Sequence, residues 1–265
     1  MTTDRGTVVA ATNATAVARR VLTTALALAE MAQCQVLAVH VVDGPTEAVE
    51  SMAAHAGIPL RQLSGPPGPA LLEATEADSV FGTVLGTHER PVPSPIVGSI
   101  ARYLLERTTK PVVVVPPLAD PPIAFKRLLV PLEGSAISTE PVFRVLSPLL
   151  GADVEVVVLH VFTEDTLPRM LDRPYRDLEL LGREFLAYHW PTATRIEMRA
   201  GPVAASVVEV AHQERSQLVV LSWRQEVAEG RAQVLRDVLR FSALPVMVLP
   251  ASERSRGAAE EARAS

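Results

Sequence analysis

The chain of 265 residues is 48% hydrophobic and 21% charged, with a formal net charge of −5 at pH 7, which is enough for two domains with substantial apolar cores. Its basic residues are scattered rather than clustered, and this argues against nucleic acid as a partner. Because the N-terminus is charged and no uncharged apolar run reaches about eighteen residues, we expect a soluble, cytoplasmic protein with neither signal peptide nor membrane partner.

Along the first half of the chain, short apolar runs alternate with segments of helical periodicity. The apolar runs are typical of strands buried on both faces of a parallel sheet: VVAAT (8–12), VLAVHVV (36–42), IPLRQL (58–63), GTVLG (82–86) and PVVVV (111–115). Good helix formers with apolar spacings of three and four residues predict helices at 15–33, 69–77 and 98–109. The single cysteine, Cys34, lies in a helix-to-strand connection, where we expect it to pack rather than react.

The second half of the chain repeats the first. LLVPLEGS (128–135) matches VVAATNAT (8–15) at an offset of 120 residues. The other matching pairs are VLAVHVV with VVVLHVF (156–162), 64–74 with 200–210, and 104–116 with 238–250. Between the two copies, PPLADPP (116–122) carries closely spaced prolines, which is typical of a linker.

Strands that alternate with helices predict a doubly wound, Rossmann-like α/β domain in each copy. We expect domains at 1–118 and 119–252, followed by a disordered polar tail at 253–265. The last strands, 112–115 and 246–249, are apolar, and each would leave a sheet edge uncovered. We therefore expect these two strands to pair within one chain, as an internal pseudo-dimer.

Ligands of doubly wound sheets bind at the carboxyl ends of the strands, which makes two loops in each copy candidates. One loop follows the first strand, as TNAT (12–15) or LEGS (132–135), and the other follows the fourth strand, at 86–99 or 222–233. Free amides at the start of the next helix, near Ser99, can hold a phosphate. The stretch GTHERPVPSPIVGS (86–99) is thus where a nucleotide phosphate would lie.

Three motifs resemble those of the universal stress proteins: LLVPLEGS, VLGTHER (84–90) and GSIARYLLERTTKPVVVVP (98–116). The resemblance covers residues 7–250 as two tandem copies. It implies five-stranded parallel sheets of the adenine-nucleotide alpha-hydrolase type, dimerisation through the last strand and, in many members, an ATP site. In those members an acidic residue after strand one lies near the adenine, and a glycine-rich loop after strand four surrounds the ribose and phosphates. The candidate cofactors are ATP or AMP with magnesium.

The first copy keeps part of the nucleotide pattern. Its candidate binding residues are Asn13, Gly86, Thr87, His88, Arg90, Gly98 and Ser99. Glu89 replaces the second glycine of the loop, and a carboxylate facing phosphates repels them by about one to several kcal/mol, which Arg90 can offset. The alternative is that Gly86 and Gly98 only end a strand and begin a helix, and that three prolines between them stiffen a loop that has lost its ligand.

The second copy has a degenerate cleft. It keeps the first loop, with Glu133, Gly134 and Ser135. At the positions of the phosphate-loop motif it carries other residues, namely Ser222, Gln225, Ala232 and Gln233. Trp223, at the end of the fourth strand, is a candidate to plug the vacant ligand position. We therefore expect no ATP in this copy.

Several further side chains have a structural and a functional interpretation. His40 and His160 occupy equivalent positions, and we expect a hydrogen bond near the strand end rather than chemistry. The stretch 173–191 fills most of an insertion in the second copy and carries Phe185, Tyr188 and Trp190 on a charged helix. Phe185 and Tyr188, three residues apart, should share a face against the sheet, and a partner-binding surface is the alternative.

No set of residues indicates catalysis. Metal-ligand spacing, a dinucleotide G-x-G-x-x-G, a P-loop and a G-x-S-x-G elbow are all missing from the sequence, so we predict neither a metal nor a catalytic residue. The first hypothesis is a stress-response or regulatory protein with at most a weakened adenine-nucleotide site in the first copy. The second is an interaction scaffold that binds no nucleotide and has an unknown protein partner, with further homo-oligomerisation open. The third is a hydrolase of an adenylated small molecule.

Overall fold

The computed structural model describes residues 6–87, 98–151, 153–163, 176–193, 195–223 and 231–251. The first repeat contains β1 (Thr7–Ala11), α1 (Val17–Ala32), β2 (Gln35–Val41), α2 (Glu47–His55), β3 (Leu60–Leu63), α3 (Pro67–Glu76), β4 (Val80–Gly86), α4 (Ser99–Leu105) and β5 (Val112–Val115). The second contains β6 (Arg127–Pro131), α5 (Ala136–Leu146), the 3-10 turn η1 (Ser147–Leu149), β7 (Glu155–Phe162), α6 (Arg176–His189), β8 (Arg195–Ala200), α7 (Val203–Gln213), β9 (Leu218–Trp223), α8 (Arg231–Phe241) and β10 (Val246–Pro250).

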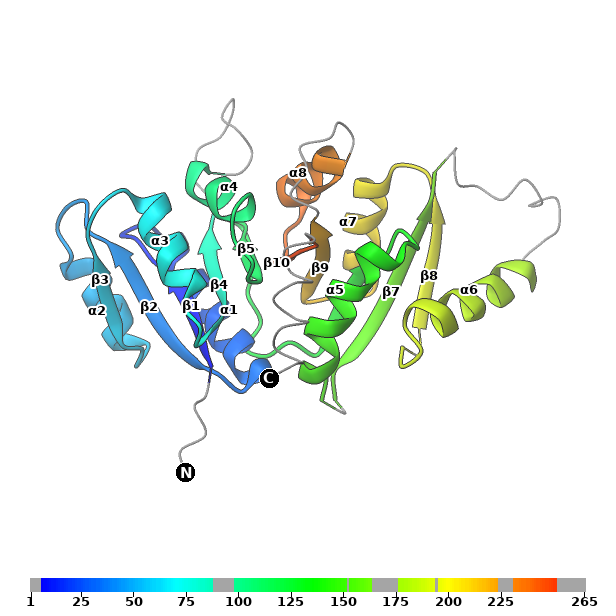
Figure 1. The fold of residues 1–265 in the computed structure, drawn as a ribbon, viewed down its shortest axis with the longest axis horizontal. Coiled ribbons are helices and arrows are strands. Elements are labelled where there is room, and N and C mark those ends of the chain that lie inside the picture. Colours follow the sequence, from blue (N-terminus) through cyan, green and yellow to red (C-terminus); the bar gives the residue numbers. More distant parts are fainter. Residues whose placement is uncertain are drawn as a thin grey trace.

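The ten strands among the described residues form one sheet, in the order β3-β2-β1-β4-β5-β10-β9-β6-β7-β8. Within each half the strands are parallel, and the halves meet at β5 and β10, which pair antiparallel with Met247 opposite Val113. Figure 1 shows the two halves on either side of this central pair. The predicted pairing of the last strands is confirmed, and it merges the two expected five-stranded sheets into a single ten-stranded one.

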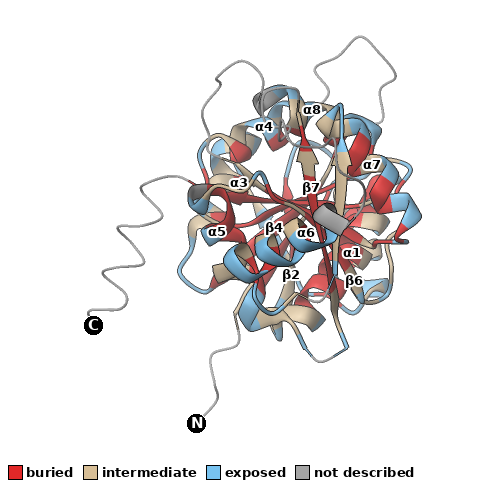
Figure 2. Cartoon of the chain, turned by 90° about the vertical axis from the view of Figure 1, so that its right-hand side faces the viewer, coloured by how far each residue is buried: buried red, intermediate tan, exposed pale blue. Residues whose placement is uncertain are grey.

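Two apolar cores, one on each face of the sheet, hold the halves together. The first lies under α1, α2, α5 and α6 and includes Val113, Val115 and Met247. The second lies under α3, α4, α7 and α8 and includes Val112 and Val248. Because successive side chains of a strand point to opposite faces, the continuous valine run of β5 contributes to both cores. Figure 2 shows the buried strands inside and exposed helix surfaces outside.

The predicted elements agree with the structure except for small shifts at their ends. The first helix, predicted at 15–33, begins at Val17 and ends at Ala32, where Gln33 turns the chain with a φ of 54°. Cys34 is half-buried against the first core, as expected, and burial raises the pKa of its thiol. The domain boundaries stay a prediction, and the tail expected at 253–265 lies outside the described residues.

Candidate functional site

The loop after β1 is exposed and held by its own side chains. The amide of Thr12 donates to the carbonyl of Val39 at 2.8 Å, which ties the start of the loop to β2. The Asn13 side-chain oxygen accepts hydrogen bonds from the amide of Thr15 at 3.2 Å and from its hydroxyl at 2.6 Å. Asn13, Ala14 and Thr15 are exposed, so this part of the candidate site is open to solvent.

Gly86 ends β4 where α1 crosses it closely. A Cβ atom added to Gly86 would lie 2.5 Å from Cγ1 of Val17, so any larger residue here would have to displace Val17, and packing alone favours glycine. The next residue, Thr87, is 8% exposed, and its amide donates to the carbonyl of Val115 at 3.1 Å. These contacts favour the structural interpretation of Gly86, and they leave the Thr87 amide engaged within the sheet.

Of the remaining candidate residues in this loop, the structure describes Gly98 and Ser99. Gly98 is extended and precedes α4, and its carbonyl accepts from the amide of Arg102 at 3.0 Å. Ser99 is the exposed first residue of α4. The other two candidates, His88 and Arg90, lie outside the described residues, together with Glu89 and the three prolines at 91, 93 and 95.

The corresponding first loop of the second repeat is a tighter turn. Gly134 has a φ of +84°, in the left-handed region that favours glycine. The Ser135 hydroxyl caps α5 by accepting from the amide of Ser138 at 3.4 Å, and the two hydroxyls are 2.8 Å apart. The Ser135 hydroxyl also lies 3.3 Å from a carboxylate oxygen of Glu133, to which it donates. Glu133, Gly134 and Ser135 therefore take part in the turn and cap that begin α5.

Phe185 of α6 lies over this turn. A Cβ atom on Gly134 would be 3.2 Å from Cε2 of Phe185, and the rings of Phe185 and His160 are 4.6 Å apart. Phe185 also packs against the first core, whereas Tyr188 is 81% exposed. The expectation that both aromatic side chains face the sheet is therefore wrong for Tyr188. Trp190, just beyond α6, is fully buried, with its ring edge-on to Phe143 at 5.4 Å.

The other predicted cleft residues of the second repeat belong to β9. Ser222 and Trp223 pair with Leu249 and Pro250 of β10, and the amide of Ala251 donates to the Trp223 carbonyl at 2.7 Å. The Trp223 side chain is half-buried against the core under α7 and α8. That Trp223 plugs a vacant ligand position stays a prediction. Gln225 and the side chain of Ala232 lie outside the described residues, and Gln233 is exposed on α8.

The two equivalent histidines make the expected hydrogen bonds. Nδ1 of His40 is 3.0 Å from the carbonyl oxygen of Thr12, and Nδ1 of His160 is 2.9 Å from that of Leu132. Each imidazole therefore joins its strand, β2 or β7, to the loop that follows the first strand of its repeat. These hydrogen bonds give both positions a structural reason to carry histidine.

Burial depresses the pKa of His189, whose ring lies tilted against that of Phe185 at 4.5 Å, and the neighbouring His160 lowers this pKa further. A histidine with a depressed pKa in the fold resists protonation there but accepts a proton in the unfolded chain. The fold should therefore lose stability as pH falls below about 6.5, the ordinary histidine pKa. In thermal melts at pH 7 and pH 5, His189→Gln should lessen this loss by on the order of 1 °C. An equal or larger loss in the variant would contradict the prediction.

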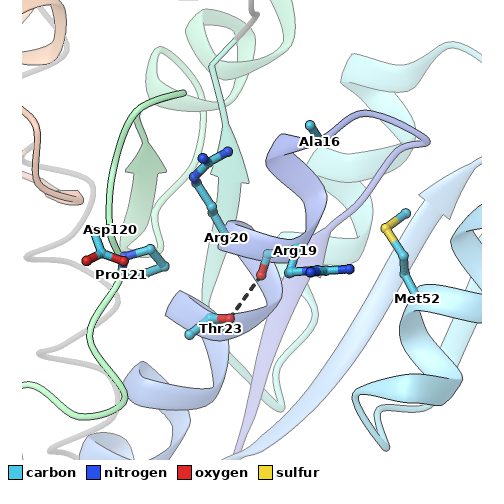
Figure 3. A pocket seen from close by; sticks show the side chains of 7 residues that line it. All are labelled: Ala16, Arg19, Arg20, Thr23, Met52, Asp120 and Pro121. Carbon is cyan, nitrogen blue, oxygen red and sulfur yellow. Dashed lines mark hydrogen bonds between the residues drawn. The ribbon is translucent and has the colours of Figure 1, made fainter.

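A hollow of about 510 Å³ lies along α1, at a place that the sequence patterns do not indicate. Its lining residues are Ala16, Arg19, Arg20, Thr23, Met52, Asp120 and Pro121. Figure 3 shows the Arg19 and Arg20 side chains pointing in different directions. Because the two guanidinium groups do not converge and the hollow is open, its volume alone does not mark a ligand site.

Neither a metal-ligand cluster nor a membrane-spanning helix is present in the described part of the chain. Within the described ranges, no three His, Cys, Asp or Glu side chains gather as metal ligands would. None of the described helices is both long enough and apolar enough to cross a membrane.

Comparisons with solved structures show the fold of the whole chain. A functionally unknown protein from Pseudomonas aeruginosa PAO1 has a TM-score of 0.71 and 13% identity, with 98% of this chain and 97% of that chain covered. A universal stress protein from Archaeoglobus fulgidus DSM 4304 has a TM-score of 0.64 and 14% identity, with 95% and 98% covered. No curated protein matches the sequence.

One universal stress protein was solved in complex with cAMP; it is 20% identical, has a TM-score of 0.36 and aligns with 48% of this chain and 98% of its own. The model of the Universal stress protein family matches residues 47–116 and 124–250, one segment in each repeat. The two segments span most of the chain, which therefore belongs to the universal stress protein family.

Proposed function

We propose that this protein is a non-catalytic, stress-response regulator that binds an adenine nucleotide weakly, and only in its first repeat. The observation that carries the proposal is the contrast between the two first loops. Asn13, Ala14 and Thr15 are exposed, whereas Gly134 has Phe185 packed over it. A base can therefore approach the loop after β1 but meets a side chain at the loop after β6.

Weak binding follows from the residues that replace the family's contacts. The Asn13 oxygen already accepts two hydrogen bonds from Thr15, so a ligand must compete with the loop for it. The amide of Thr87 is likewise engaged with Val115. Glu89 adds a negative charge in the phosphate loop. The binding of ATP or AMP with magnesium would then depend on contacts from four other residues of the loop after β4: His88, Arg90, Gly98 and Ser99.

The proposal predicts a thermal shift with nucleotide that a charge at Ser99 removes. At 100 times its dissociation constant, ATP with magnesium should stabilise the fold by about 2.7 kcal/mol, or several degrees. Ser99→Glu places a carboxylate beside the phosphates and should weaken binding about tenfold or more. Gln233→Glu, the same type of change at the matching position of the second repeat, should leave the shift intact.

Two further measurements decide the outcome. Glu89→Gly should strengthen ATP binding, because it removes the repulsion. Mass spectrometry of freshly denatured protein should identify a released adenine nucleotide if one is carried through purification. No shift in the parent protein or in Glu89→Gly, with no released nucleotide, would reject a nucleotide role.

The second candidate function is an interaction scaffold that binds no nucleotide, and α6 favours it. Tyr188 is 81% exposed and Leu180 54% exposed on this helix, so two large apolar side chains face solvent. If nucleotide binding fails, a partner that contacts α6 is the function to pursue. The Tyr188→Ser variant would then lose that partner in a pull-down experiment, whereas Ser99→Glu would keep it.

A further inference from the structure

The Phe185 ring lies in a slot built by three elements of the second repeat. On one side is the turn after β6, where Cε2 of Phe185 is 3.2 Å from the position of a Gly134 Cβ. The imidazole of His160 on β7 lies at 4.6 Å between ring centroids, and that of His189 on α6 lies at 4.5 Å. Phe162, edge-on to His160 at 4.7 Å, continues the row of rings.

Two walls of the slot, the His160 imidazole and the turn after β6, are fixed by contacts that do not involve Phe185. The hydrogen bond between His160 and the Leu132 carbonyl orients that imidazole. Ser135 caps α5 and, with the positive φ of Gly134, sets the turn. A Cβ at 134 would press on the ring, so the glycine also makes room for an aromatic group. The slot is therefore preorganised for a flat ring.

The first repeat has no such filling among its described residues. The hydrogen bond of His40 to Thr12 matches that of His160 to Leu132, but no described aromatic side chain stacks on His40. The equivalent loop residues, Asn13, Ala14 and Thr15, are exposed. Phe185 lies on α6, which stands between β7 and β8 as α2 stands between β2 and β3, so the ring belongs to a helix that both repeats share and not to an inserted one.

We propose that the second repeat contains a latent binding slot for a small planar aromatic molecule, and that Phe185 occupies this slot within the same chain. The side chain holds the turn after β6 closed, as a bound ring would. The slot becomes available when the Phe185 ring is removed. This inference concerns the second repeat and is independent of nucleotide binding in the first.

The test is to remove the ring and return it in solution. Phe185→Ala should melt several degrees below the parent protein, and indole should raise the melting temperature of the variant by about 2–4 °C more than that of the parent. Adenine should also raise the melting temperature of Phe185→Ala more than that of the parent. Cyclohexanol, which is of similar size but is not planar, should give no such difference. Tyr188→Ala, on the exposed side of the same helix, should melt like the parent and show no rescue.

The proposal is overturned if folded Phe185→Ala shows no selective stabilisation by indole, or if cyclohexanol stabilises it equally. Should Phe185→Ala not fold by itself, refolding is carried out with and without indole. Recovery of native circular dichroism only with indole supports the slot, and no recovery with it rejects the slot. A response of Tyr188→Ala equal to that of Phe185→Ala would also reject it.

Discussion

Met247→Lys should uncouple the two halves of the sheet and destabilise the protein by about 4 kcal/mol or more. Met247 is 0% exposed and lies opposite Val113, also 0% exposed, at the antiparallel junction. An ammonium group there would be buried in the apolar core between the halves, whose described residues include no carboxylate, and this burial costs several kcal/mol. Guanidinium denaturation followed by tryptophan fluorescence would measure the loss, because Trp190 and Trp223 are both in the second half.

The matched control for this substitution is Leu118→Lys in the linker between the repeats. Leu118 is 86% exposed, so the same charge there should change the free energy of unfolding by no more than about 0.5 kcal/mol. Equal denaturation midpoints for Met247→Lys and the parent protein would mean that the β5–β10 pairing contributes little to stability.

Gly82→Ala is expected to have the second largest effect, a destabilisation of about 2–3 kcal/mol. A Cβ on Gly82 would lie 2.6 Å from the carbonyl oxygen of Pro111, which is backbone and cannot rotate away. That oxygen also accepts from the amide of Thr83 at 2.9 Å, so moving it weakens the pairing of β4 with β5. A melting temperature roughly 4–12 °C below that of the parent should result.

Gly44→Ala is the control for Gly82→Ala because, apart from its two chain neighbours, no described residue has a heavy atom within 4 Å of the added Cβ. A glycine replaced without strain tends to stabilise by about 0.4–1 kcal/mol, through the reduced freedom of the unfolded chain. The free energy of unfolding should therefore fall in Gly82→Ala and rise slightly in Gly44→Ala. If Gly82→Ala melts like Gly44→Ala, the sheet accommodates the methyl group and the packing argument for this glycine fails.

Much of the fold could be predicted because it rests on regular patterns. Apolar runs such as Val112–Val115 have one explanation in an α/β protein, a strand buried on both faces. The pairing of β5 with β10 followed from the need to cover two apolar edges. By contrast, α2 was not predicted, since only Val49 and Ala53 of its residues are buried and so short an apolar pattern gives little signal.

The candidate site was harder to predict, because its properties depend on contacts between distant residues. Gly86 fits a nucleotide motif in the sequence, but only the position of Val17 reveals its packing role. Phe185 and Gly134 meet across elements far apart in the chain, and no local pattern indicates such a contact. Three residues along a helix leave an angular offset of about 60°, which is enough to separate a half-buried Phe185 from an exposed Tyr188.

The antiparallel junction of β5 and β10 has a consequence for how the protein behaves on dilution. In an assembly of two separate chains, the corresponding contact is lost at low concentration, and each substitution is present twice. Here the linker keeps the two repeats at a high effective concentration of each other, so the junction should stay formed when the protein is diluted to nanomolar concentration. A substitution also affects one half only. The two halves can therefore acquire different properties, as the exposed loop at Asn13 and the covered turn at Gly134 already illustrate.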